Sequence, residues 1–118
     1  MTDAEIREYM DTEKALARIR GNNKLFKTLL MHFLATRNQF DQLKQEIAAN
    51  DREAAAKSVH AIKGVAANLS MTRLYDLCPP FEALLKSGDD VSAAFSDYET
   101  TYEKTIECVN VLLQTLPS

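Results

Sequence analysis

The sequence predicts an all-α fold, an antiparallel up-and-down four-helix bundle preceded by one or two short N-terminal helices. Apolar residues recur at three- and four-residue steps through most of the 118 residues, and this is the period of helices with one buried face. The chain contains only 3 glycines and 3 prolines, so few positions interrupt the period. Long amphipathic helices with short connections pack most simply as antiparallel neighbours.

The N-terminal half contains two short helices and one long helix. The first is expected over residues 3–9. Asp11 or Thr12 then caps the second, because a short side-chain oxygen can bond to the free amides of a first helical turn. The run Gly21-Asn22-Asn23 ends this second helix. A long helix follows over residues 23–49, and its core stripe consists of Phe26, Leu29, Leu30, Phe33, Phe40, Leu43 and Ile47.

The C-terminal half contains three further helices. Asp51 caps the first of them, which buries Ala55, Val59, Ile62, Ala66 and Leu69. Residues 70–72 form a tight break before the second helix. There the pair Pro79-Pro80 is expected to kink the helix or to start a new one, since proline lacks an amide donor and clashes with the preceding turn. Residues 87–90 end that helix, and an apolar stripe from Val91 to Leu116 marks the last one. One domain over residues 1–118 is the simplest organisation, since no linker or repeat is found.

Composition and charge narrow the classes of function. A hydrophobic fraction of 46% is ordinary for a globular protein, and a net charge of -3 argues against nucleic-acid binding, which needs a basic stripe. No apolar run approaches the roughly 20 residues of a membrane-spanning helix, and the acidic start MTDAEIREYMD is not a secretory signal. Cys78 and Cys108 lack CxxC spacing, which indicates reduced, partly buried thiols and a cytoplasmic location.

The segment HAIKGVAANLS, residues 60–70, contains the main functional candidate. Successive helical residues rotate by about 100°, which places Ala56, Lys63, Gly64 and Ala67 on the side of His60 and away from the buried stripe. His60 is therefore expected to be exposed among one cation and three small residues. Glycine inside a helix costs roughly 1 kcal/mol relative to alanine, so Gly64 indicates the close approach of another molecule. A helix contact within the bundle is the alternative.

Three interpretations of an exposed imidazole are open: it has no role, it binds a metal ion, or it acts as a nucleophile. No His, Cys or carboxylate lies at a suitable helical spacing from His60, so no metal site is predicted. A neutral imidazole can attack a phosphoryl group with its ring lone pair. Lys63, one turn away, could then pair with the phosphoryl oxygens, at roughly 1.5–3 kcal/mol for a charge-assisted hydrogen bond. His32 has no such surroundings and is expected at the edge of the core.

His60, Ile62, Lys63, Gly64 and Leu69 resemble the motif of the histidine-containing phosphotransfer (HPt) domain family, stand-alone type, with Ser70 where glycine is commoner. The segments DTEKALARIRGNNKLFKTLLMHFL and LYDLCPPFEALLKSGD are also similar to helices of that family. The resemblance implies that His60 accepts a phosphoryl group from a receiver-domain aspartate and passes it to another receiver. It implies that Lys63 steadies the phosphate and that Gly64 makes room for the receiver, which would dock on the surface near Ala56, Gly64 and Ala67.

The same resemblance suggests that Glu82 orients the imidazole and that Lys86 adds positive charge, although a solvated pair at i,i+4 is the alternative. The implied partners are receiver domains of response regulators or a hybrid sensor histidine kinase, bound transiently by a monomer. Mg2+ is expected in the partner receiver, and no cofactor in this chain. No glycine-rich phosphate loop occurs, so no autokinase activity is expected. The alternative function is a non-catalytic helical-bundle module that binds receiver domains or partner helices.

Overall fold

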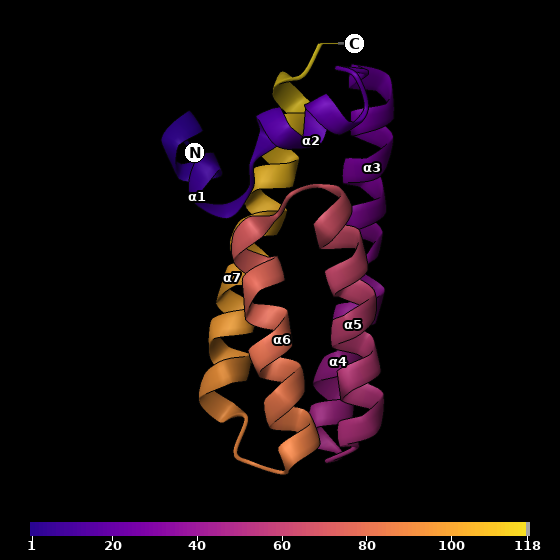
Figure 1. Cartoon of the computed structure of the whole chain (residues 1–118), viewed down its shortest axis with the longest axis vertical. Coiled ribbons are helices and arrows are strands. Elements are labelled where there is room, and N and C mark those ends of the chain that lie inside the picture. The colour runs from indigo at the N-terminus through magenta and orange to yellow at the C-terminus, as the bar shows by residue number, and fades with distance from the viewer. Residues whose placement is uncertain (118) are drawn as a thin grey trace.

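The computed structural model describes residues 1–117, which form seven helices and no strand. Four rods, one of them made of two consecutive helices, lie side by side and alternate in direction (Figure 1). This arrangement confirms the predicted all-helical bundle. None of the helices in this range combines the length and the apolarity needed to cross a membrane. The helix bounds are α1 Asp3–Tyr9, α2 Thr12–Arg18, α3 Asn23–Ala35, α4 Arg37–Ala48, α5 Arg52–Asn68, α6 Thr72–Ser87 and α7 Ser92–Thr115.

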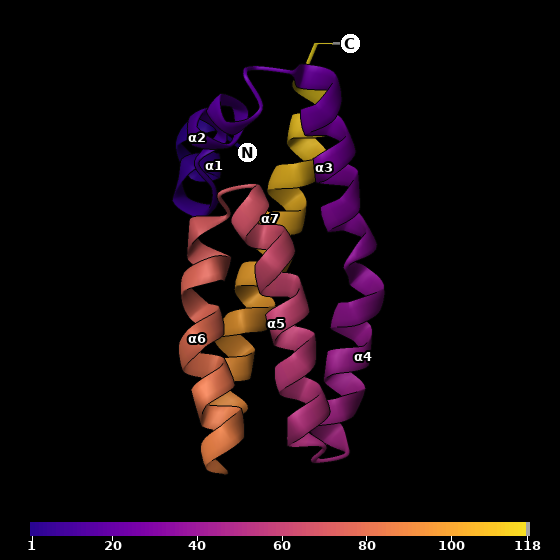
Figure 2. The ribbon, with the colours of Figure 1, turned by 45° about the vertical axis from the view of Figure 1, so that its right-hand side comes forward.

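The long helix expected over residues 23–49 is two helices, α3 and α4, which meet at Thr36. The Thr36 amide bonds to the Phe33 carbonyl, three residues back, and its hydroxyl donates to the same carbonyl at 2.6 Å. Because that hydroxyl proton is used, the Tyr102 hydroxyl donates to the Thr36 oxygen, 2.8 Å away. The backbone of Thr36 stays near helical angles, so α3 and α4 still form one rod of the bundle (Figure 2).

Helix α6 continues through Pro79 and Pro80, so the expectation that this pair might start a new helix is wrong. Each proline leaves one carbonyl, four residues earlier, without an intrahelical amide partner. These are the carbonyls of Tyr75 and Asp76. Both prolines and both of these residues are exposed, so the carbonyls can bond to water and the helix does not have to end. Glu82 therefore stays on the same helix as the residues that precede the prolines.

The two N-terminal helices close one end of the bundle (Figure 2). α1 packs against α7 and α6, and α2 packs against α3. Asp11 caps α2, as predicted, by accepting a hydrogen bond from the Lys14 amide. The Asp11 amide in turn donates to the Ser70 carbonyl at 2.9 Å. Ser70 has a φ of 52°, and this left-handed residue follows the end of α5.

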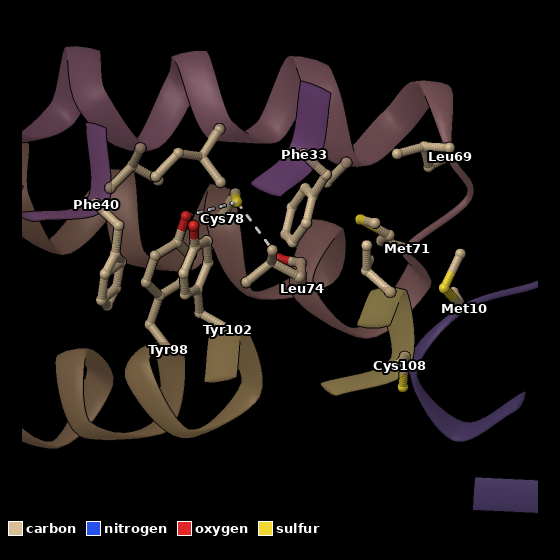
Figure 3. Packing of buried hydrophobic residues seen from close by; sticks show 14 of the residues in the cluster. Met10, Phe33, Phe40, Leu69, Met71, Leu74, Cys78, Tyr98, Tyr102 and Cys108 are labelled. Atoms are coloured by element: carbon tan, nitrogen blue, oxygen red, sulfur yellow. Dashed lines mark hydrogen bonds between the residues drawn. The ribbon is translucent and has the colours of Figure 1, made fainter. Parts of the chain in front are cut away.

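The core combines an aromatic cluster with aliphatic and sulfur side chains (Figure 3). The rings of Phe40 and Tyr102 stack with centroids 4.2 Å apart, and Tyr98 lies next to them. The Cys78 thiol donates to the Leu74 carbonyl at 3.3 Å, and it is a free thiol like that of Cys108. The predicted inner face of α5 is fully buried at Ala55, Val59, Ile62, Ala66 and Leu69. The bundle thereby holds α5 with its opposite face toward solvent.

Candidate functional site

His60 lies on the outer face of α5, with 75% of its side chain exposed. The helix begins at Arg52 and is capped by Asp51, whose side chain accepts a hydrogen bond from the Ala54 amide. Val59 and Ile62 are fully buried, and this anchors the opposite face of the helix against the core. His60 is thus exposed, as the helical period predicts, on a segment whose inner face is fixed by packing.

Glu82 of α6 approaches the imidazole directly. Its Oε1 lies 3.3 Å from Nδ1 of His60, and only 14% of its side chain is exposed. α5 and α6 are consecutive antiparallel helices that pack along their length (Figure 1), which brings the middle of one beside the middle of the other. The structure therefore places Glu82 where it can orient the ring, with one ring nitrogen facing a carboxylate.

Lys63 follows His60 by one turn and is half-buried. Its Nζ lies 5.6 Å from the centroid of the Tyr75 ring. No carboxylate of residues 1–117 comes within ion-pair distance of this ammonium. The ammonium of the predicted phosphate-stabilising residue thus contacts an aromatic ring and not a carboxylate.

Gly64 is exposed on the same face. A Cβ placed on it would meet no atom within 4 Å, apart from the adjacent backbone of its own helix. The alternative explanation for this glycine, a helix contact within the bundle, is therefore wrong. The bare backbone at this position opens directly to solvent.

The two alanines of the predicted docking surface lie in different settings. Ala56 is only 8% exposed, so the expectation of an exposed contact is wrong for it. α6 packs over this part of α5, and Ala56 lines a groove of about 650 Å³ together with His60, Glu82 and Leu85. Ala67 is half-buried, at the other end of the face.

Charged residues border this groove and the turn at the end of α5. Lys86 is exposed and lines the groove that contains His60 and Glu82. Arg52, on the same groove, donates to the Leu84 carbonyl of α6 at 3.2 Å. At the other end, Arg18 of α2 donates to the Ala67 carbonyl at 2.5 Å.

Tyr75 and Arg18 are the residues near this face that the sequence reading missed. Tyr75 lies seven residues before Glu82, so a seven-residue step along α6 would have placed both on one side of the helix. Arg18 comes from a helix outside the four-helix core, and no local pattern connects it with α5. His32, expected at the edge of the core, is exposed near the end of α3. His32 directly precedes the buried Phe33, so helical rotation turns it to the solvent side of the apolar stripe, which explains why it is exposed.

No three His, Cys, Asp or Glu side chains lie close enough together to hold a metal ion in the described part of the chain. The site consists of one exposed imidazole, a carboxylate at its Nδ1, a lysine one turn later on the same helix and an open backbone patch. This set suits nucleophilic attack through the imidazole on an anionic group.

Comparison with known proteins agrees with this assignment. The family model described as Hpt domain matches residues 29–115, well over half of the chain. The match includes all of α5 and α6, and with them His60, Lys63, Gly64 and Glu82. No significant match was found among curated proteins or among solved structures. The chain belongs to the Hpt domain family.

Proposed function

We propose that His60 accepts a phosphoryl group from the aspartyl phosphate of a receiver domain and passes it to a second receiver. Hpt domains act in histidine phosphotransfer in two-component signalling, together with receiver domains of response regulators. The observation that carries the proposal is the exposed His60 ring with Glu82 at Nδ1. A proton held on Nδ1 by the carboxylate leaves the Nε2 lone pair as the nucleophile.

The transfer itself needs positioning and charge more than covalent help from the protein, because its transition state is loose. The Nε2 lone pair forms the new N–P bond while the P–O bond to the receiver aspartate breaks, and the aspartate leaves as a carboxylate. The ring then carries positive charge as long as Nδ1 keeps its proton. Glu82 faces this charge, and Lys63 supplies a cation for the phosphoryl oxygens. Mg2+ held by the partner receiver would supply further positive charge at the phosphoryl oxygens.

A receiver would dock over the open face of α5. His60 lies between the groove lined by Ala56 and the bare backbone at Gly64, so a partner can reach the ring from the solvent side. Each partner must leave after transfer, and a small, transient interface suits a monomeric carrier. The free thiols of Cys78 and Cys108 support a reducing, cytoplasmic setting for this step.

Replacement of the phosphoacceptor tests the proposal. Wild type incubated with a panel of phosphorylated receivers should acquire an acid-labile phosphoryl group, seen by mass spectrometry, and His60→Gln should acquire none. The matched control is His32→Gln, because His32 is the only other histidine in the chain and is also exposed. Equal labelling of the His60 variant would contradict the assignment. Receiver binding without any transfer to wild type would favour the non-catalytic module.

The role of Glu82 can be separated from that of the histidine. Glu82→Gln keeps the size of the side chain and removes its charge, which exchanges a charged partner of the ring for a neutral one. The difference between such contacts is about 1 kcal/mol, so transfer should slow by roughly fivefold. Glu53→Gln is the control, since Glu53 borders the same groove but pairs with Lys57 at 3.7 Å. Equal rates for wild type and Glu82→Gln would exclude an electrostatic role for Glu82.

The docking surface has its own test. Gly64→Gln places a flexible polar side chain on the open backbone patch without a clash inside the bundle. Transfer from a phosphorylated receiver should slow, because the receiver cannot approach as closely, while the far-UV circular dichroism stays that of wild type. An unchanged transfer rate in a folded Gly64→Gln protein would remove the argument that Gly64 makes room for the partner.

A further inference from the structure

The contact between Lys63 and Tyr75 has a feature that distinguishes it from similar contacts in this protein. Nζ of Lys63 lies 5.6 Å from the Tyr75 ring centroid, within the roughly 6 Å range of a cation–π interaction. Tyr75 belongs to the first turn of α6 and is 39% exposed. Lys63 lies on α5, the helix that carries His60, and its side chain meets that of Tyr75 across the α5–α6 pair.

Every other cation that lies over an aromatic ring in residues 1–117 also has a carboxylate partner. Arg37 lies over Tyr102 and pairs with Glu103. Lys44 lies over Phe40 and pairs with Glu99. The third, Arg73, lies over Tyr9 and pairs with Glu8. Among the described residues, Lys63 is the one cation that lies over an aromatic ring and has no carboxylate partner.

This difference bears on phosphoryl transfer. A carboxylate beside Lys63 would compete with phosphoryl oxygens for the ammonium and would add negative charge where a dianionic group arrives. An aromatic ring attracts the ammonium through its quadrupole and carries no formal charge. The contact is also weaker than a charge-assisted hydrogen bond to a phosphoryl oxygen, so the ammonium can exchange one partner for the other.

We propose that Tyr75 is a positioning residue, whose ring holds the ammonium of Lys63, one turn after His60 on α5, and releases it to the phosphoryl oxygens as the N–P bond forms. Lys63 remains protonated throughout, and the bonds made and broken are those of the transfer to Nε2. The inference rests on the proposed role of His60 as phosphoacceptor. It adds a residue that the sequence motif around His60 does not contain.

Kinetics of four variants test this role. Tyr75→Leu removes the ring, so the Lys63 side chain is no longer ordered before the phosphoryl group arrives. Transfer from a phosphorylated receiver should slow by about two- to tenfold, the cost of immobilising one long side chain. Tyr75→Phe keeps the ring face and should stay close to wild type. In a Lys63→Gln background, Tyr75→Leu should cause no further loss. A loss of the same size in that background would overturn the inference, because Tyr75 would then act without Lys63.

A second measurement does not depend on phosphorylation. In wild type and Tyr75→Phe, the ring current should shift the Lys63 ε-methylene proton resonances upfield, and Tyr75→Leu should remove the shift. Equal resonances in wild type and Tyr75→Leu would overturn the contact and leave the proposed function intact. Absence of phosphohistidine in wild type, with the ring-current shift present, would overturn the role of His60 instead. Because Tyr75 is partly exposed, the leucine variant should fold, and circular dichroism checks this.

Discussion

Replacement of Gly64 by alanine should make the protein more stable. Gly64 lies inside α5, and glycine at such a position costs about 0.8–1.0 kcal/mol relative to alanine. A Cβ at this position meets no atom within 4 Å beyond its own helix, so no steric term opposes the gain. We therefore expect the free energy of unfolding to rise by about 1 kcal/mol. For a domain of this size, that corresponds to roughly 3–6 °C in Tm.

Urea denaturation followed by far-UV circular dichroism measures this effect. The matched control is Ala61→Gly, because Ala61 is exposed on the same helix three residues earlier, and this reverse change should destabilise by a similar amount. If Ala61→Gly behaves as expected and Gly64→Ala fails to stabilise, the glycine serves the fold and not an incoming partner. A more stable Gly64→Ala protein that transfers phosphate more slowly would be a trade of stability for function.

Three further predictions concern the fold. Ser70→Gly should stabilise by about 1 kcal/mol, because Ser70 has a φ of 52° and its buried hydroxyl has no partner among the described residues. Tyr102→Phe should lower the free energy of unfolding by about 0.5–1.5 kcal/mol, since Thr36 keeps its bond to the Phe33 carbonyl. Burial raises the pKa of Cys78 and of Cys108 to about 11, so native protein at pH 8 should resist iodoacetamide. Unfolded thiols ionise near pH 9 while the native ones stay protonated, so stability should fall as the pH rises from about 9 to 11.

Each of these predictions has a control and a contradicting result. Ser70→Ala removes the hydroxyl but keeps the Cβ, and stability equal to that of Ser70→Gly would exclude backbone strain as the cause. A Tyr102→Phe protein as stable as wild type in urea would show that the hydroxyl bond contributes nothing net. Alkylation of native protein as fast as in denaturant would contradict the burial of the thiols. A stability that does not change between pH 9 and pH 11 would contradict the raised thiol pKa values.

Features that depend on neighbouring residues were predictable from the sequence. Asp11 and Asp51 cap helices by bonding to amides three residues later, so both the residue type and the position are local signals. The exposure of His60 and the burial of Val59 follow from helical rotation alone. The break at Thr36 was not predictable in this way, because the hydroxyl that bonds to its side chain comes from the distant Tyr102.

The contacts at the site that the sequence did not predict depend on how α5 packs against α6. The approach of Glu82 to His60 depends on the register of α5 against α6, which no single-helix pattern contains. The burial of Ala56 has the same origin, since α6 covers one end of the face that rotation places in solvent. The contact of Lys63 with Tyr75 also requires that register. The roles of these residues in transfer, the partner's Mg2+ and the cytoplasmic location remain predictions.

The packing of the N-terminal helices bears on where this domain can be truncated. The family match begins at residue 29, yet Met10 and Phe26 are both fully buried, and α1 packs against α6 and α7. A recombinant fragment trimmed to the matched segment would lose these side chains and uncover apolar surface at one end of the rods. A fragment that keeps this packing is therefore longer than the matched segment, and truncation studies of phosphotransfer should retain residues 1–28.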